Sequence, residues 1–191
     1  MIDSILPSYS RANLRFVKGE GVWLFTENGE KYLDMGAGIA VNCLGHANPH
    51  LTKVLTDQAS QLWHTSNLYH IPNQEKLAKN LVQSTFADTV FFTNSGSESN
   101  DTVLRTARRF WRLLGKPEKR IFISRMEAYH GSTVVGASLC GQSYYHEMDG
   151  LPIPDIEHIE CPYWYKNGGE LSKDDYGLKA ARALETKIKE L

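Results

Sequence analysis

The sequence has little of the chemistry that marks secreted, metal-binding or nucleic-acid-binding proteins. Its 191 residues contain three widely spaced cysteines, which fit neither a disulfide framework nor a paired metal site. The formal net charge of −1 offers no basic surface for a nucleic-acid backbone. No run approaches the roughly 18 consecutive apolar residues of a membrane helix, and the start MIDSILPSYSRANL lacks the pattern of a signal peptide. We therefore expect a cytoplasmic protein without nucleic-acid or membrane partners.

The N-terminal part carries the patterns of a hairpin and two helices. Residues 20–34 alternate apolar and polar on both sides of Asn28-Gly29, which predicts a β-hairpin. Asn48 is a favourable N-cap before Pro49, and Pro72 begins a second helical pattern. The apolar side chains that we expect to face inward on these helices are Leu51, Val54, Leu55, Leu62, Trp63, Leu77, Leu81 and Val82.

After residue 85, predicted strands alternate with predicted helices, which is typical of an α/β protein with a mostly parallel sheet. The expected strands are residues 89–93, 120–125 and 156–160, and the expected helices are 98–114, 131–139 and 174–191. In the helix at 98–114 we expect the arginines Arg105, Arg108, Arg109 and Arg112 to form the solvated face. The final helical pattern has no C-cap signal, so we expect the chain to be a fragment of a larger α/β protein.

The turn Ser95-Gly96-Ser97-Glu98, which follows the expected strand at 89–93, has two interpretations. As a capping box, Ser95 would cap the helix and Glu98 would reach back to the cap, with no ligand needed. As an anion site, Gly96 would let the backbone approach a ligand, while Ser97 and the free N–H groups of the helix N-terminus would donate hydrogen bonds. The turn lacks the lysine of a P-loop, so a single phosphate is the more natural occupant.

A second turn, Tyr129-His130-Gly131, follows the next predicted strand. Tyr129 can offer a ring face to a planar ligand, and Gly131 permits close approach, although a packed core tyrosine has the same sequence pattern. Because both turns follow strands, we expect them to be neighbours at the carboxyl edge of the sheet. Together they favour a flat, phosphorylated cofactor.

The motifs also resemble a known family. TNSGSES followed by TARR and then by AYHGST is similar to the class III aminotransferases, the ornithine, 4-aminobutyrate and ω-amine group. Upstream segments agree in order and spacing: GEGVWLFTENGEKYLD, GAGIAVNCLGHANPH, LWHTSNLYHIP and ADTVFFTNSGSES. The resemblance therefore extends over nearly the whole chain.

The resemblance implies an α/β protein with the pyridoxal-phosphate-dependent transferase fold of the aspartate-aminotransferase type. Residues 1–47 would be an N-terminal segment with the hairpin, and residues 48–191 an incomplete cofactor-binding large domain holding the first part of a mixed sheet. The residues implied to bind pyridoxal 5'-phosphate are Ser95, Gly96, Ser97, Tyr129, His130 and Gly131. Those implied to lie near the substrate are Ile39, Val41, Asn67 and Tyr69.

Two catalytic groups of the family are expected to be absent from this chain. The lysine that forms a Schiff base with the cofactor and the aspartate that pairs with the pyridine nitrogen both lie well downstream of the YHG motif in the family. None of the twelve lysines here stands in a matching context. We therefore predict that the 191-residue chain is inactive by itself.

The resemblance implies an amino donor and a 2-oxo acid acceptor as substrates, and a homodimer for the complete protein. Residues 1–93 resemble acetylornithine aminotransferases, whereas residues 94–191 are more similar to ω-amino acid:pyruvate aminotransferases. The donor would be an ω-amino acid, an ornithine derivative or an amine, and the acceptor pyruvate or 2-oxoglutarate. An aminomutase of the same fold and a non-catalytic phosphate-binding α/β module remain as alternatives.

Overall fold

The structure is a computed structural model that describes residues 4–191, so the first three residues of the predicted segment 1–47 lie outside it. The described chain divides into two compact units between Asn80 and Leu81. These units are defined by their internal contacts and not by function, so the domain boundary predicted at residue 47 stays a prediction. No helix among the described residues is long and apolar enough to cross a membrane.

The first unit contains a three-stranded antiparallel sheet with the order β1-β2-β3. Its strands are β1 (Phe16–Glu20), β2 (Trp23–Thr26) and β3 (Lys31–Leu33). The predicted hairpin is confirmed as β2 and β3, joined by a turn in which Gly29 has φ +81° and only Gly29, not Asn28, uses the left-handed region. Strand β1 was not predicted, and it pairs with β2 with a register shift between Phe16 and Lys18.

A short turn and two helices follow this sheet. The turn is α1 (Ala37–Ala40), and the helices are α2 (Pro49–Ala59) and α3 (Pro72–Ser84), which runs across the boundary of the units. The Asn48 side chain accepts hydrogen bonds from the N–H groups of His50 and Leu51, which confirms it as the N-cap of α2. The expectation of inward-facing apolar side chains is wrong, because neither helix buries a residue.

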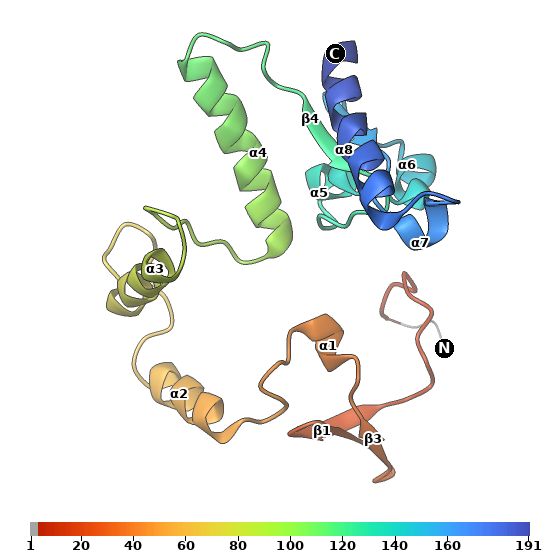
Figure 1. The fold of residues 1–191 in the computed structure, drawn as a ribbon. Helices are drawn as coiled ribbons and strands as arrows, with labels where there is room; N and C mark the ends of the chain where they lie inside the picture. The colour runs from red at the N-terminus through yellow and green to blue at the C-terminus, as the bar shows by residue number, and fades with distance from the viewer. Residues whose placement is uncertain (1–3) are drawn as a thin grey trace. The chain divides into compact units, whose positions relative to one another are not determined.

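The second unit is built around two parallel strands. Strand β4 (Phe122–Arg125) pairs with β5 (Ile156–Ile159), which confirms two of the three predicted strands. Helix α5 (Val134–Leu139) packs on both strands and against α4 (Gly96–Leu113), and α8 (Lys173–Glu190) packs on β5 (Figure 1). The remaining helices are α6 (Ser143–Asp149) and α7 (Trp164–Asn167), which periodicity did not predict.

The strand predicted at residues 89–93 is not formed. A strand is defined by hydrogen bonds to a neighbour, and no described residue pairs with this segment, whose Phe91 side chain is exposed. An apolar run predicts that a segment is buried, but a strand also needs a neighbouring strand to hydrogen-bond with.

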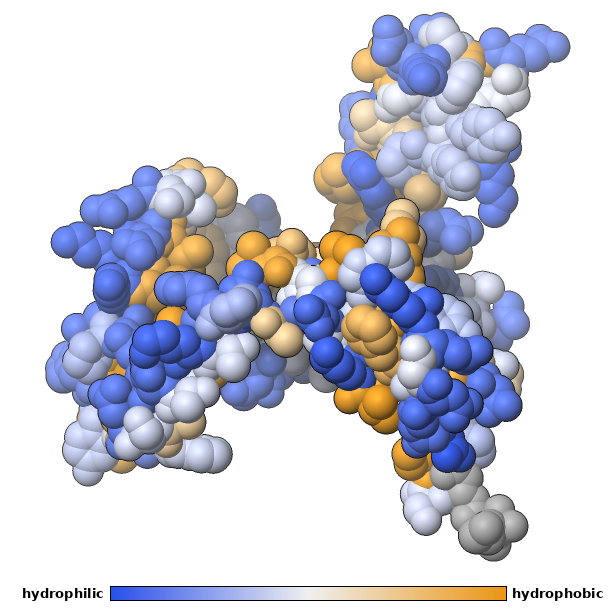
Figure 2. All heavy atoms as spheres, turned by 90° about the horizontal axis from the view of Figure 1, so that it is seen from below, coloured by the Kyte–Doolittle hydropathy of each residue, from blue (hydrophilic) through white to orange (hydrophobic). Residues whose placement is uncertain are grey.

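The buried hydrophobic side chains of the described residues all lie in the second unit. They are Leu104, Ala137, Cys140, Ile156, Ile159, Tyr176 and Ala180. Many other apolar side chains of both units are exposed, and Figure 2 shows them as orange surface among the hydrophilic blue. The core is therefore small, and it is concentrated in the second unit, where α5 and α8 pack on the parallel strands and α4 packs on α5.

The prediction that the arginines of α4 form a solvated face is wrong for Arg108. Its guanidinium lies 3.4 Å from the Asp155 carboxylate and 5.7 Å from the centre of the Phe122 ring. Val103 and Phe110 of the same helix are exposed. Arg108 is therefore only partly solvated, with 36% of its side chain exposed, and the ion pair with Asp155 offsets the partial loss of hydration.

Candidate active site

The first predicted turn is the N-terminus of α4. The Ser95 hydroxyl accepts a hydrogen bond from the Glu98 N–H at 3.2 Å, as a capping box requires. The Glu98 carboxylate accepts from the Asn94 N–H at 2.6 Å, one residue earlier than expected. Because its hydroxyl oxygen is engaged in the cap, Ser95 shapes this turn.

The next two residues leave hydrogen-bonding capacity open. Among the described residues, no acceptor is recorded for the backbone N–H groups of Gly96 and Ser97, as expected in the first turn of a helix. A Cβ built on Gly96 meets no atom within 4 Å, so the space over this backbone is open. Free N–H groups and the positive end of an 18-residue helix dipole are a suitable environment for an anion.

The structure brings the second predicted turn against the first. The Ser132 N–H donates to the Ser97 hydroxyl at 3.2 Å, and a Cβ on Gly131 would lie only 2.2 Å from the same oxygen. Gly131 has φ +113°, so glycine is required here both by conformation and by the close approach of Ser97. The expectation that the two turns are neighbours is therefore met by direct contacts.

Two further hydrogen bonds join helix α4 to this second turn. The Asn100 amide donates to the His130 carbonyl at 2.8 Å, and the Thr133 hydroxyl donates to the Asp101 carboxylate at 2.9 Å. Sequence reasoning missed Asn100 and Asp101. Their position one turn after Gly96, as polar residues at the start of an otherwise amphipathic helix, is the signal that could have identified them.

His130 is held from beneath as well. The ring Nε2 of His130 lies 3.2 Å from the hydroxyl of Ser124 in β4. The backbone N–H of His130 donates to the Cys140 sulfur at 3.1 Å. Cys140 is fully buried, and its thiol also donates to the Gly131 carbonyl at 3.4 Å. This network fixes the backbone on both sides of residue 130.

Tyr129 is exposed for 65% of its surface, so its ring is not a core aromatic. Tyr145 is close to Tyr129, and its pKa is raised to about 12. The largest cause is the hydrogen bond with Tyr144 and the second is burial, while the charges of Tyr129 and Cys140 act in the same direction. The Tyr145 hydroxyl therefore stays protonated at neutral pH. Tyr129 directly precedes the turn at His130 and Gly131 that contacts Ser97, and its stacking on a planar ligand stays a prediction.

The residues predicted to lie near the substrate belong to the other unit. Ile39 and Val41 are 93% and 73% exposed, and Asn67 and Tyr69 are exposed on the loop between α2 and α3. Their place in a substrate pocket stays a prediction. The turn that carries Ile39 has φ values of +46°, +62°, +62° and +63° at residues 37–40, a left-handed conformation that costs about 1–2 kcal/mol for each non-glycine residue.

Asp34 stands at the start of this turn. Its Oδ1 accepts from the N–H groups of Gly36 and Ala37 at 3.1 and 2.8 Å, and its Oδ2 lies 2.7 Å from His46 Nε2. The hydrogen bond from His46, and after it the one from the Ala37 N–H, holds the pKa of Asp34 below its ordinary value. Because the carboxylate can only accept, His46 Nε2 carries the shared proton.

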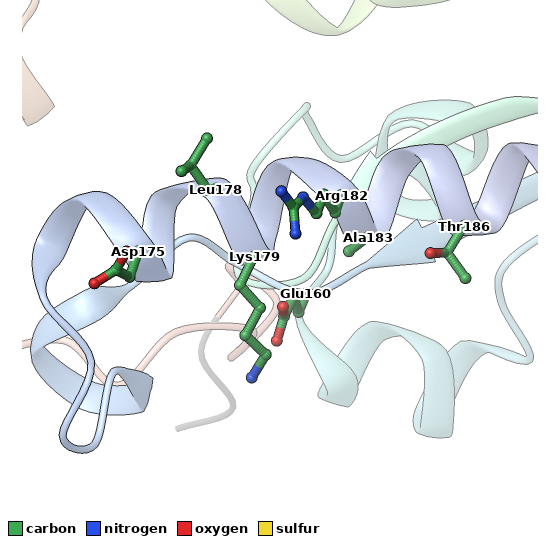
Figure 3. A pocket seen from close by; sticks show the side chains of 7 residues that line it. All are labelled: Glu160, Asp175, Leu178, Lys179, Arg182, Ala183 and Thr186. Carbon is green, nitrogen blue, oxygen red and sulfur yellow. The ribbon is translucent and has the colours of Figure 1, made fainter.

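A separate hollow lies along α8 near the end of β5 (Figure 3). It is lined by Glu160, Asp175, Leu178, Lys179, Arg182, Ala183 and Thr186. In Figure 3 the Lys179 side chain extends to the same side as Glu160, away from Leu178. None of the residues predicted to bind the cofactor lines this hollow, and we assign it no role in the site.

The comparisons with known proteins identify the family of the chain. The family model for aminotransferase class-III matches residues 7–191. The chain therefore belongs to the class-III aminotransferase family. It is 48% identical to the acetylornithine aminotransferase of Brucella melitensis over 97% of this chain and 43% of the relative. It is 42% identical to the putrescine--pyruvate aminotransferase of Pseudomonas aeruginosa over 91% of this chain and 39% of the relative.

Solved structures give the same fold. The omega-transaminase from Pseudomonas jessenii in complex with PMP superimposes with a TM-score of 0.88 at 35% identity, covering 93% of this chain and 40% of that one. An (S)-enantioselective omega-transaminase from Thermomicrobium roseum has a TM-score of 0.86 at 31% identity. The chain thus spans about two fifths of the length of these relatives. Both kinds of curated relative match over nearly all of it, and the predicted division at residue 93 stays a prediction.

Proposed function

We propose that the protein containing this chain is a pyridoxal-phosphate-dependent aminotransferase. It moves an amino group from an ω-amino acid, an ornithine derivative or an amine to a 2-oxo acid. The observation that carries this proposal is the contact of the Ser97 hydroxyl with the Ser132 N–H, because it joins an open anion-binding helix terminus to a turn with an exposed tyrosine ring. The names of the relatives support both the reaction and the substrate classes.

The residues present fit the cofactor. The N–H groups of Gly96 and Ser97 and the Ser97 hydroxyl would bind its phosphate, and the Tyr129 ring would cover one face of its pyridine ring. His130 and Gly131, fixed by Asn100, Ser124 and Cys140, would hold Tyr129 in place. When bound, pyridoxal phosphate takes up the amino group and draws electrons from the carbon that loses a proton.

Among the described residues, no lysine donates a hydrogen bond to Gly96, Ser97 or Tyr129. Lys166 pairs with Glu127 at 3.8 Å, close in sequence to Tyr129, but its side chain is exposed like that of an ordinary surface lysine. We therefore propose that these 191 residues bind the cofactor without a covalent bond and do not turn over substrate alone. The full activity, a homodimeric assembly and a cytoplasmic location are proposed for the complete protein.

The cofactor site is tested by spectroscopic titration of the full-length gene product with pyridoxal phosphate. Ser97→Ala and Tyr129→Ala should each raise the dissociation constant about 10- to 100-fold, since each removes a contact to the charged or aromatic part of the ligand. Tyr165→Ala, at an exposed tyrosine of α7, is the matched control and should leave it unchanged. Wild-type affinity in both site variants would refute the site.

The reaction is tested by product analysis with the same protein. An aminotransferase releases an oxo product from the donor and an amino acid from the acceptor in equal amounts, whereas an aminomutase releases neither. A non-catalytic phosphate-binding module would show no turnover and no covalent adduct after borohydride reduction. Equal formation of the two products is the expected result.

A further inference from the structure

A hydrogen bond between the side chains of Asp34 and His46 joins the two ends of the loop that these residues bound. Asp34 Oδ2 and His46 Nε2 lie 2.7 Å apart, although the residues are twelve positions apart in the chain. Their side chains are only 12% and 21% exposed, so this pair is largely shielded from water. A shielded, short hydrogen bond to a carboxylate is stronger than the exposed ion pairs elsewhere in this unit.

The His46 end of the loop is anchored to the hairpin. His46 and Gly21 exchange two backbone hydrogen bonds, of 2.7 and 3.0 Å, as an isolated antiparallel bridge. The His46 ring packs directly on the backbone of Gly19, where a Cβ would lie 2.5 Å from its Cγ atom. The ring is therefore held against strand β1, and the backbone of His46 against the turn that follows this strand.

The Asp34 end determines how the loop begins. One carboxylate oxygen binds His46, and the other binds the N–H groups of Gly36 and Ala37, which open the left-handed turn. Ile39, a β-branched residue that avoids this conformation, stands inside the turn with an almost fully exposed side chain. Such a conformation persists only where surrounding contacts impose it, and Asp34 supplies the contacts at its start.

We propose that Asp34 and His46 are positioning residues that set the place of Ile39 and Val41 in the amino-donor pocket. This inference rests on the proposed function, because it takes Ile39 and Val41 as donor-side residues. The pair belongs to the first unit, whereas both turns proposed to bind the cofactor belong to the second. It acts through the loop conformation, and its loss therefore affects recognition of the donor and not binding of the cofactor.

The test uses Asp34→Ala and His46→Ala in the full-length gene product, with a short and a long amino donor. We expect kcat/KM for the preferred donor to fall about tenfold or more, because small displacements of pocket groups are costly in rate. The preference between the two donors should fall as well, while the dissociation constant of pyridoxal phosphate stays within about twofold. Glu20→Ala, an exposed acidic residue of the same sheet, is the matched control and should change none of these values.

His46→Gln is the conservative variant, since its amide can still donate to Asp34, and it should restore part of the donor preference. It also carries the test if an alanine variant fails to fold. Unchanged donor preference in all pair variants, with an active wild type, would overturn the inference. So would a cofactor affinity that falls in parallel with kcat/KM. Absence of turnover in the wild type would refute the proposed function instead.

A double-mutant cycle shows whether the pair acts through the turn. In an Ile39→Ala background, Asp34→Ala should have little further effect on donor preference, because the side chain that it positions is already gone. Full additivity of the two substitutions would contradict the proposal.

Discussion

Helices α2 and α3 of the first part of the chain differ sharply from the helices around β4 and β5. Both α2 and α3 are amphipathic in sequence, yet neither buries a residue. Helix α8 buries Tyr176 and Ala180, and the much shorter α5 buries three consecutive residues, Gly136, Ala137 and Ser138. The contrast shows that an apolar stripe stabilises a helix only where a partner surface is present within the chain.

The largest expected effect comes from Tyr176, which is 1% exposed and donates its hydroxyl to the Cys161 carbonyl at 3.1 Å. Tyr176→Ala should lower the free energy of unfolding by about 3–5 kcal/mol, because it leaves a cavity the size of an aromatic ring. Leu55→Ala in α2, at a side chain 70% exposed, should cost less than about 0.5 kcal/mol. Urea titrations followed by circular dichroism measure both.

Tyr176→Phe separates packing from hydrogen bonding at the same site. It keeps the ring and should cost about 1–3 kcal/mol, the usual penalty when a buried carbonyl loses its partner. If Leu55→Ala proved as damaging as Tyr176→Ala, α2 would have a buried face in solution, and the contrast between the two groups of helices would fail.

The same contrast explains what could be predicted from the sequence. Helices α2 and α3 were predicted from their caps and periodicity, which are local properties of Asn48 and Pro72. The inward orientation of Leu77 and Leu81 and the strand at 89–93 were wrong, because burial and strand pairing depend on segments far away in the chain. A period identifies which face is apolar, but it does not identify what covers that face.

For the candidate site, the sequence predicted the two turns and their proximity. It did not predict Asn100 and Asp101, whose bridges to the second turn depend on how α4 lies against α5, nor the Asp34–His46 pair. Polar residues at the start of the helix mark Asn100 and Asp101 as candidates, but the sequence does not show which residues, thirty or more positions away, they bind. The cofactor and substrate roles came from the family resemblance, and the cofactor titration above tests them.

The next largest effect distinguishes two glycines of the site. Gly131→Ala places a methyl group 2.2 Å from the Ser97 hydroxyl at a φ of +113°, and it should destabilise the second unit by about 1–3 kcal/mol. Gly96→Ala meets no atom and should leave the free energy of unfolding unchanged within about 0.5 kcal/mol. Both substitutions should weaken binding of pyridoxal phosphate. A loss of stability in Gly131→Ala alone would then show that Gly131 has a structural role in addition to its ligand role, whereas Gly96 has only the ligand role. Equal stability of the two variants would show that the turns are not in contact.

A smaller effect is expected when the N-cap residues of α2 and α4 are replaced. Asn48→Ala and Ser95→Ala each remove a side-chain acceptor from the first turn, a change worth about 0.5–2 kcal/mol. In α2 the loss should appear only as faster amide hydrogen exchange within that helix. In α4, which buries Leu104, it should also lower the urea midpoint of the second unit. A global effect of Asn48→Ala would contradict the local stability of α2.

The smallest expected effect is a pH dependence of the stability of the second unit. His158 on β5 is half-buried beside His146, with ring centres 4.9 Å apart, and burial lowers its pKa below the ordinary value of about 6.5. The unfolded chain therefore takes up a proton as the pH falls through about 6.5, while the folded chain does so only at lower pH. Stability is then greatest above about pH 7 and declines until the folded pKa is passed. His158→Gln should flatten this decline in urea midpoints, whereas His50→Gln, at an exposed residue of α2, should retain the wild-type slope. An unchanged slope in His158→Gln would show that this imidazole is as hydrated in the folded protein as in the unfolded chain.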